Sequence, residues 1–143
     1  VTNGVPDQAK AWGNVRFPDQ TIADEITTML EALNTSQDAL PGVKVHRSFN
    51  RPAKPMIPAT ESLALKARSV AEALGQKLPF AKTGGVCDGN ILQQAGLPTI
   101  DTLGVRGGGL HTPDEWIEIP SLVERCQLLA ILIARLSAGG SES

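Results

Sequence analysis

The chain has 143 residues, with 13 lysines and arginines against 15 aspartates and glutamates, which gives a net charge of −2. This length fits one domain or two small ones. The charge balance argues against nucleic acid or an acidic membrane as the main partner, because both require a concentrated positive field. No apolar run reaches the roughly 18 residues of a spanning helix, and the printed residues do not open with a signal-peptide pattern. Cys87 and Cys126 are too few for a disulfide scaffold, so we expect a cytoplasmic protein.

The first part of the chain predicts a strand, a helix and a second strand. Residues 8–17 alternate between apolar and polar side chains, which is typical of a half-buried strand. Thr21 and Asp24 have the spacing of a capping box, and the apolar residues that follow predict an amphipathic helix over 21–34. A second short strand is expected over 43–47. Two strands alone leave bare edges, so this is half of a small α+β sandwich and marginal by itself.

A connector with three prolines between residues 50 and 58 divides the chain, and we place a domain boundary after residue 54. The two predicted domains are 1–54 and 55–143. The second predicts an α/β arrangement, with short strands at 80–81 and 98–103. We expect its helices over 60–74, 89–95 and 121–137, with end signals at Thr60, Gly75, Gly96, and Ser121 with Glu124. The last helix is so apolar that it requires burial on more than one side.

The most informative motif is the glycine run Gly107-Gly108-Gly109 with His111 just after it. Three consecutive glycines are costly in a regular element, but they suit a backbone that must approach a ligand closely. The alternative interpretation is a flexible turn beside a surface histidine. Neutral imidazole is the commonest metal ligand, and Asp114 or Glu115 can orient nearby groups. One histidine is not a metal site, because zinc needs at least three protein ligands.

A second motif runs from Thr83 to Asn90 and joins a Gly-Gly pair to Asp88 at a predicted helix start. Such turns bind ligands at the carboxyl edge of α/β sheets. Cys87 in this motif is either a nucleophile or, as we favour, a small packed residue. A nucleophilic cysteine would need His46 or His111 as its base, and neither has a nucleophile signature around it. We interpret His46 as structural or solvated.

Two arginines form the third group. Arg16 and Arg51 each close a predicted strand, and a proline follows Arg51 at once and Arg16 after one residue. Arginine is the side chain suited to bidentate carboxylate recognition. On pattern alone, ordinary surface arginines are the alternative.

Taken in order, these motifs resemble the di-zinc carboxypeptidase and deacylase family, which includes glutamate carboxypeptidase, acetylornithine deacetylase and succinyl-diaminopimelate desuccinylase. The resemblance spans the chain from Asn3 to about Leu136, and its last two motifs are the specific ones. The segments that carry it are Asn3-Gly4-Val5-Pro6-Asp7, Asn14-Val15-Arg16-Phe17, Asn50-Arg51-Pro52, Gly84-Gly85-Val86-Cys87-Asp88-Gly89-Asn90 and Gly107-Gly108-Gly109-Leu110-His111-Thr112-Pro113-Asp114-Glu115.

The resemblance implies a fold and a set of roles. Residues 1–54 would be the second half of a lid, or dimerisation, domain, and residues 55–143 the last segment of the catalytic domain. His111 matches a zinc ligand, and Asp88 matches an acidic position that supports the site without touching substrate. The positions that match contacts to the substrate's free carboxylate are Asn3, Arg16, Arg51, Gly107, Gly108 and Gly109.

The chemistry implied by the resemblance is amide hydrolysis in a small N-acyl amino acid or peptide with a free carboxylate, closest to the glutamate-carboxypeptidase branch. Two zinc ions, or cobalt or manganese, would activate a water molecule. The family's catalytic base and its other zinc ligands have no match in this segment. We therefore expect that the chain alone neither binds two zinc ions tightly nor hydrolyses substrate, and that a longer parent protein forms a homodimer through the lid. The alternatives are a non-catalytic dimerisation fragment, which uses the edge of strand 8–17, and a cysteine hydrolase using Cys87.

Overall fold

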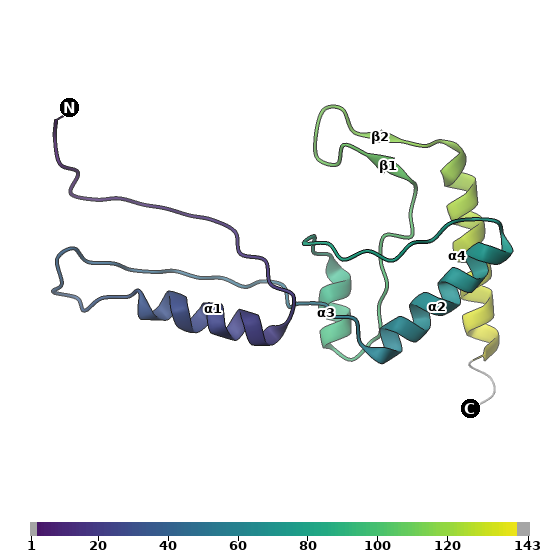
Figure 1. Cartoon of the computed structure of the whole chain (residues 1–143), viewed down its shortest axis with the longest axis horizontal. Coiled ribbons are helices and arrows are strands. Elements are labelled where there is room, and N and C mark those ends of the chain that lie inside the picture. The colour runs from purple at the N-terminus through teal and green to yellow at the C-terminus, as the bar shows by residue number, and fades with distance from the viewer. Residues whose placement is uncertain (1–2, 140–143) are drawn as a thin grey trace.

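The structure is a computed structural model that describes residues 3–139. Residues 3–50 form a long arm, residues 51–57 form a connector, and the remaining elements gather at the base of the arm (Figure 1). Helices and a small antiparallel sheet together fit an α/β fold in the broad sense. In chain order the elements are α1 (Gln20–Ala32), α2 (Pro58–Ala73), α3 (Asp88–Gln94), β1 (Gly107–Gly108), β2 (Trp116–Ile117) and α4 (Pro120–Gly139).

Helix α1 of the arm confirms the predicted amphipathic helix, but it begins differently. Asp19 is the N-cap, and its carboxylate accepts a hydrogen bond of 3.0 Å from the backbone N–H of Ile22. The predicted capping box of Thr21 with Asp24 is therefore wrong, because an acidic side chain two residues earlier satisfies the first turn. Ala23 is the buried residue of this helix, so most of its surface faces solvent.

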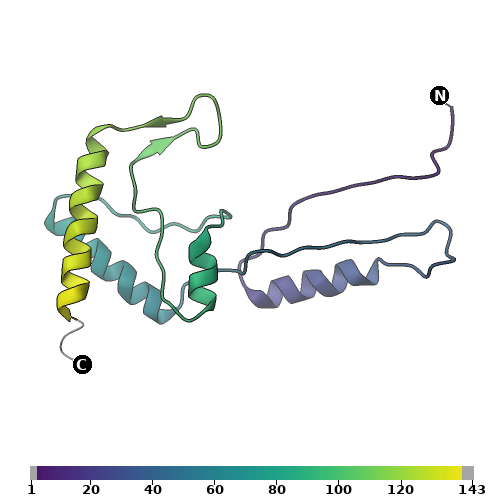
Figure 2. The same ribbon diagram turned by 180° about the vertical axis from the view of Figure 1, so that it is seen from behind.

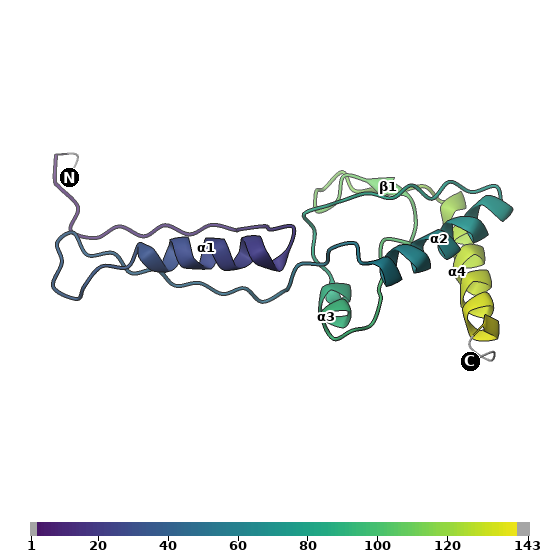
Figure 3. The same ribbon diagram turned by 60° about the horizontal axis from the view of Figure 1, so that its bottom comes forward.

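The two strands predicted in the arm are wrong. Residues 8–17 and 43–47 are extended and run along α1, but neither forms a ladder with another strand in the described part of the chain (Figures 1 and 3). An alternating sequence requires a partner to become a strand, because its backbone hydrogen bonds are made to another segment. The rings of Phe17 and Phe49, 5.3 Å apart, join the two extended segments instead.

The core lies where α2 packs against α4, seen from behind in Figure 2. Three alanines of α2, at positions 64, 67 and 71, are almost fully buried, and their small side chains allow α4 to approach closely. Leu128 of α4 is fully buried against this surface. The cluster of buried apolar residues contains Ala67, Val70, Ala71, Leu128 and Leu132.

The predicted helix ends are partly confirmed. Gly75 and Gly96 follow α2 and α3 with φ of +69° and +94°, the left-handed conformation that ends a helix. Thr60 is not a cap, because α2 already begins at Pro58 and Thr60 lies inside its first turn. Ser121 is not a cap either, since it lies inside α4 and its hydroxyl accepts a hydrogen bond of 3.0 Å from the backbone of Arg106.

The only strands in residues 3–139 belong to a hairpin that the sequence did not predict. Gly107 pairs with Ile117 and Gly108 with Trp116 in an antiparallel register. The strands predicted at 80–81 and 98–103 are wrong, because no other segment pairs with them. Ile100 and Leu103 of the second segment pack instead beside the core cluster as irregular extended chain.

Helix α4 is buried along one narrow stripe, formed by Ser121, Arg125, Leu128 and Leu132. This spacing follows the helical repeat, so one face of α4 is buried, and its Leu128 and Leu132 pack against α2. The expectation that α4 is buried on more than one side is not met within residues 3–139, where Val123 and Ile133 are 64% and 60% exposed. None of the helices in this part of the chain is long and apolar enough to cross a bilayer.

Replacing Leu128 by alanine tests this core. We expect Leu128→Ala to lower the free energy of unfolding by about 2–5 kcal/mol, because it removes a fully buried side chain and leaves a cavity. Urea denaturation followed by circular dichroism measures the change. The matched control is Val123→Ala, on an exposed part of the same helix, which should cost less than about 0.5 kcal/mol. Equal losses in the two variants would contradict the assigned core.

Candidate functional site

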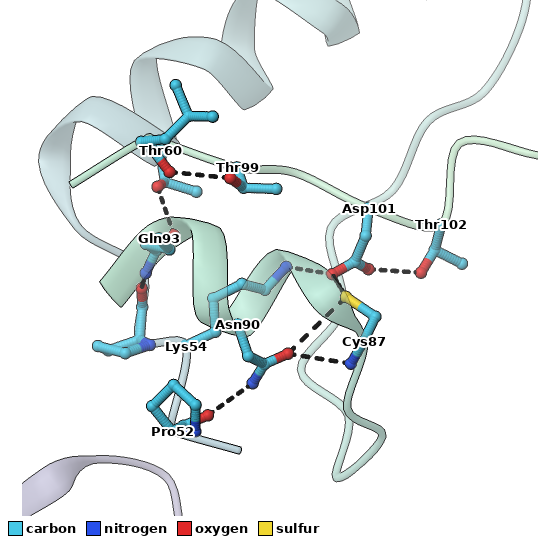
Figure 4. A network of polar contacts seen from close by, with 11 residues as sticks. Pro52, Lys54, Thr60, Cys87, Asn90, Gln93, Thr99, Asp101 and Thr102 are labelled. Carbon is cyan, nitrogen blue, oxygen red and sulfur yellow. Dashed lines mark hydrogen bonds and ion pairs between the residues drawn. The ribbon is translucent and has the colours of Figure 1, made fainter. Parts of the chain in front are cut away.

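The connector is held against α3 by side-chain amides. Asn90, which is buried, donates from Nδ2 to the carbonyl oxygen of Pro52 over 2.8 Å. Gln93, also buried, donates from Nε2 to the carbonyl oxygen of Pro55 over 2.7 Å and accepts from the hydroxyl of Thr60. Figure 4 shows this network along one side of α3. An unpaired buried amide would be costly, so these contacts specify where the connector lies.

Arg51 precedes the first of these prolines and forms an ion pair with Asp88, the first residue of α3. The distance from Nη1 of Arg51 to Oδ1 of Asp88 is 2.6 Å. The Asp88 side chain is 86% exposed and the Arg51 side chain 32% exposed. The structure therefore brings together two residues, 37 positions apart, that the sequence identified only separately.

Arg16 approaches the same loop from the other extended segment of the arm. A Cβ atom placed on Gly84 would lie 2.9 Å from Cδ and 3.0 Å from Nη1 of Arg16, so the arginine lies directly against the glycine backbone. Any larger residue at position 84 would have to displace this side chain. Arg16 of the arm and Arg51 of the connector thus both contact residues 84–88, which makes this loop the candidate carboxylate site. Sequence reasoning instead assigned the glycine contacts to 107–109.

Cys87, just before α3, lies in a polar cluster with Asp101 and Lys54 (Figure 4). Its thiol donates to Oδ2 of Asp101 over 3.3 Å, and Lys54 forms an ion pair with the same carboxylate. The Lys54 ammonium, with the Thr102 hydroxyl and the Cys87 thiol, lowers the pKa of Asp101 to about 2. No histidine forms a hydrogen bond with Cys87 among residues 3–139, and the Asp101 carboxylate that accepts from the thiol is a weak base because its pKa is so low. The arrangement therefore favours a structural cysteine.

His111 lies in the loop between β1 and β2 and is exposed. Its φ is +65°, and its backbone N–H donates to the Glu115 carboxylate over 3.2 Å. A non-glycine residue with positive φ is uncommon and marks a turn whose shape is imposed by its surroundings. In residues 3–139 no group of three or more histidine, cysteine, aspartate or glutamate side chains is placed to hold a metal ion. His111 can thus supply one ligand but not a complete site.

The glycine run is required by the hairpin itself. A Cβ atom on Gly107 would lie 2.2 Å from the carbonyl oxygen of Trp116, and one on Gly108 would lie 2.9 Å from the Trp116 indole nitrogen. Gly109 has φ +68° and would meet the Asp114 carbonyl at 2.7 Å. These contacts explain the three glycines without a ligand, and the predicted contact with a substrate carboxylate stays a prediction.

The remaining predicted residue, Asn3, is exposed. The N-terminal end of the arm lies away from α3 (Figure 1). Its side chain makes no hydrogen bond to any residue between 3 and 139. His46 is likewise exposed. Among these residues no hydrogen bond or ion pair joins His111 to Arg16, Arg51 or Asp88. The structure therefore brings Arg16, Arg51 and Asp88 together at one loop, and within residues 3–139 neither His111 nor Asn3 is bonded to that group.

Sequence reasoning missed the ion pairs of Arg106, which attach the hairpin to α4. Arg106 binds both carboxylate oxygens of Glu118 at 2.7 and 2.8 Å, and its Nη1 lies 2.6 Å from Glu124. The Glu118 and Glu124 carboxylates raise the pKa of Arg106, which in turn lowers the pKa of Glu118. The partners are 12 and 18 positions away, so no local pattern signals them.

The pH dependence of stability tests the Asp101 cluster. Because the pKa of Asp101 is lowered to about 2 on folding, its contribution is complete above the unfolded pKa of roughly 3.9 and is lost as the pH falls toward 2. We expect Asp101→Asn to cost about 1 kcal/mol at pH 7, allowing for solvent screening, and to flatten the loss of stability between pH 4 and pH 2. Urea titrations across this range measure it, with Asp38→Asn as the exposed control. Identical profiles for wild type and Asp101→Asn would exclude this contribution.

Comparison with known proteins gives a family match and two relatives of known name. The family model described as Peptidase family M20/M25/M40 matches residues 7–135. Carboxypeptidase G2 of Pseudomonas sp. (strain RS-16) is 31% identical over 143 residues, which covers 97% of this chain and 34% of that protein. Succinyl-diaminopimelate desuccinylase of Psychrobacter arcticus is 22% identical over 139 residues, covering 95% of this chain and 33% of that protein.

No solved structure matches the chain significantly. The chain spans about a third of the length of the two curated relatives. The family match covers both the arm and the helical body, which is residues 58–139. The family is one of metal-dependent peptidases and deacylases. The resemblance drawn from the motifs is confirmed, and the chain belongs to peptidase family M20/M25/M40.

Proposed function

We propose that this chain forms the substrate-carboxylate side of a zinc-dependent hydrolase that cleaves an amide bond next to a free carboxylate, with a glutamate-carboxypeptidase-like specificity. The observation that carries the proposal is the approach of Arg16 and Arg51 to the same loop, residues 84–88. The names of the two relatives, a carboxypeptidase and a desuccinylase, support the same class of reaction. In this proposal residues 1–54 are part of a lid and residues 55–143 part of a catalytic domain.

The chemical role of the two arginines is to bind and orient an anionic group. A guanidinium offers parallel N–H donors that match the two oxygens of a carboxylate, and such charge-assisted hydrogen bonds are stronger than neutral ones. Gly84 has no side chain, which allows Arg16 to lie directly against its backbone. A substrate whose carboxylate is held here presents its amide bond in a defined direction, and this raises the effective concentration of the reacting groups.

For the metal site, this chain supplies only one proposed ligand. We propose His111 as one zinc ligand, but the described residues alone do not fit a complete zinc site, since no further histidine, cysteine or carboxylate pair joins it. The other ligands and the catalytic base would come from outside this chain. No catalytic residue is assigned within residues 3–139.

A second candidate function is dimerisation without catalysis. Residues 8–17 are extended and form no backbone ladder within the described part of the chain, so their N–H and C=O groups are available to another strand. A homodimer through this edge is compatible with the first proposal as well. The two functions depend on different groups. The catalytic function depends on the side chains of Arg16, Arg51 and His111, and the dimerisation function depends on the backbone edge of residues 8–17.

The chain alone provides one test. We expect that the purified 143-residue chain does not bind two zinc ions tightly and does not hydrolyse an N-acyl glutamate in the presence of zinc. The reason is that residues 3–139 contain no complete set of zinc ligands. Calorimetric titration with zinc and a hydrolysis assay measure the two quantities. His111→Ala should leave both results unchanged. Zinc-dependent hydrolysis by this chain would overturn the assignment of the missing groups to other residues.

A second test uses a hydrolytically active protein that contains this segment. We expect Arg51→Ala to lower kcat/KM by about 10- to 100-fold, since a charged hydrogen-bonded contact to substrate contributes roughly 1.5–3 kcal/mol. Steady-state kinetics on substrates with and without a free carboxylate measure the loss, which should be confined to the first class.

The matched control is Arg47→Ala, because Arg47 is an exposed arginine of the same segment that pairs with Glu31. It should change kcat/KM less than 2-fold. If Arg51→Ala keeps full activity while Lys10→Pro, which removes one backbone donor from the edge of residues 8–17 and leaves Arg16 in place, abolishes it, the dimerisation function replaces the catalytic one.

A further inference from the structure

The contact between Arg51 and Asp88 leaves part of the guanidinium free. Asp88 meets the arginine through one hydrogen bond, from Nη1 to Oδ1 over 2.6 Å. Nε and Nη2 of Arg51 make no hydrogen bond to any residue between 3 and 139. These two atoms form the edge of a guanidinium that binds a carboxylate through two parallel hydrogen bonds. The Nε–Nη2 edge of Arg51 therefore has no partner in the described residues, while its Nη1 atom is bound to Asp88.

A second contact fixes the backbone beside this pair. Asn90 of α3 donates to the carbonyl oxygen of Pro52, so adjacent residues of the connector meet nearly adjacent residues of the helix. Asn90 is 5% exposed, and breaking its contact would leave a buried amide unpaired. Pro52 also restricts the conformation of the residue before it. The main chain of Arg51 therefore stays next to Asp88, and the ion pair selects the side-chain rotamer.

The exposure of Asp88 indicates that its contact orients the Arg51 side chain and does not stabilise the fold. Its side chain is 86% exposed, and ion pairs in that setting contribute little to the free energy of folding. An arginine side chain, by contrast, loses several rotamers when it binds a ligand. Holding Nη1 in the free protein removes part of that cost in advance. The negative charge of Asp88 also disfavours a second carboxylate at Nη1, which leaves the Nε–Nη2 edge as the place for a substrate carboxylate.

We propose that Asp88 is a positioning residue that pre-orients Arg51 to bind the substrate carboxylate through its Nε–Nη2 edge. This inference rests on the proposed function, because it assumes that Arg51 is the carboxylate-binding arginine. It differs from a competing arrangement in which Asp88 occupies Arg51 until substrate displaces it. In that arrangement the carboxylate of Asp88 would take the two-donor edge, whereas the structure shows a single contact at Nη1.

The test uses the full 143-residue chain and N-acetyl-L-glutamate as the probe, followed by NMR of the arginine Nε–H signals. In the wild-type chain the probe should shift the Arg51 signal, and Arg51→Lys should remove that signal and weaken binding. Asp88→Ala should raise the dissociation constant about 2- to 10-fold, the range expected when an arginine must be ordered on binding. Asp88→Asn should stay within about 2-fold of wild type, because its amide oxygen still accepts from Nη1.

Glu31→Ala is the matched control, since it removes the exposed carboxylate partner of Arg47 on the same segment. It should leave binding unchanged, and the circular dichroism spectra of all variants should agree. Tighter binding in Asp88→Ala establishes the competing arrangement and overturns the proposal. Unchanged binding in Asp88→Ala overturns the positioning role alone. A wild-type chain that does not bind the probe, with no shift at Arg51, overturns the carboxylate site and with it this inference.

Discussion

The hydrogen bonds from Asn90 and Gln93 to the carbonyl oxygens of Pro52 and Pro55 determine the geometry of the candidate site. Proline has no backbone N–H group, so Pro52 and Pro55 of the connector can only accept hydrogen bonds through their main chain. Both of the amides that donate to them from α3 are buried. These contacts set the point at which the arm leaves α3. Arg51 and Asp88 are neighbours as a consequence, without any strong attraction of their own.

The arm and the helical body differ in how they are stabilised. The body has a real, if small, core in which the alanines of α2 receive Leu128 and Leu132 of α4. The arm has almost none, since α1 buries only Ala23 and its extended segments carry exposed side chains such as Trp12. Large apolar side chains such as Met29 of α1 and Ile133 of α4 are exposed as well. Under the proposed function, these faces of α1 and α4 are where the remainder of the enzyme or a second subunit would pack.

The site residues show how much a motif can predict. Arg16, Arg51 and Asp88 were recognised from their residue types and neighbours. The sequence did not predict that they meet at residues 84–88, because that meeting depends on contacts between distant residues. Arg51 and Asp88, for example, are 37 positions apart. The glycine run was interpreted as a ligand-binding loop, and the structure shows a second sufficient reason for it in the close approach of Trp116. Arg106 went unnoticed because its glutamate partners lie 12 and 18 positions further along the chain.

The sequence by itself determined the four helices, to within a few residues at each end, and the left-handed glycines that end two of them. Helical hydrogen bonds join residues four apart, so their pattern is present in the local sequence. The tertiary structure alone decided which segments pair as strands and which arginine meets which carboxylate. Each of those outcomes depends on a partner distant in sequence, and an alternating segment such as 8–17 stays merely extended when the described chain offers it no neighbour.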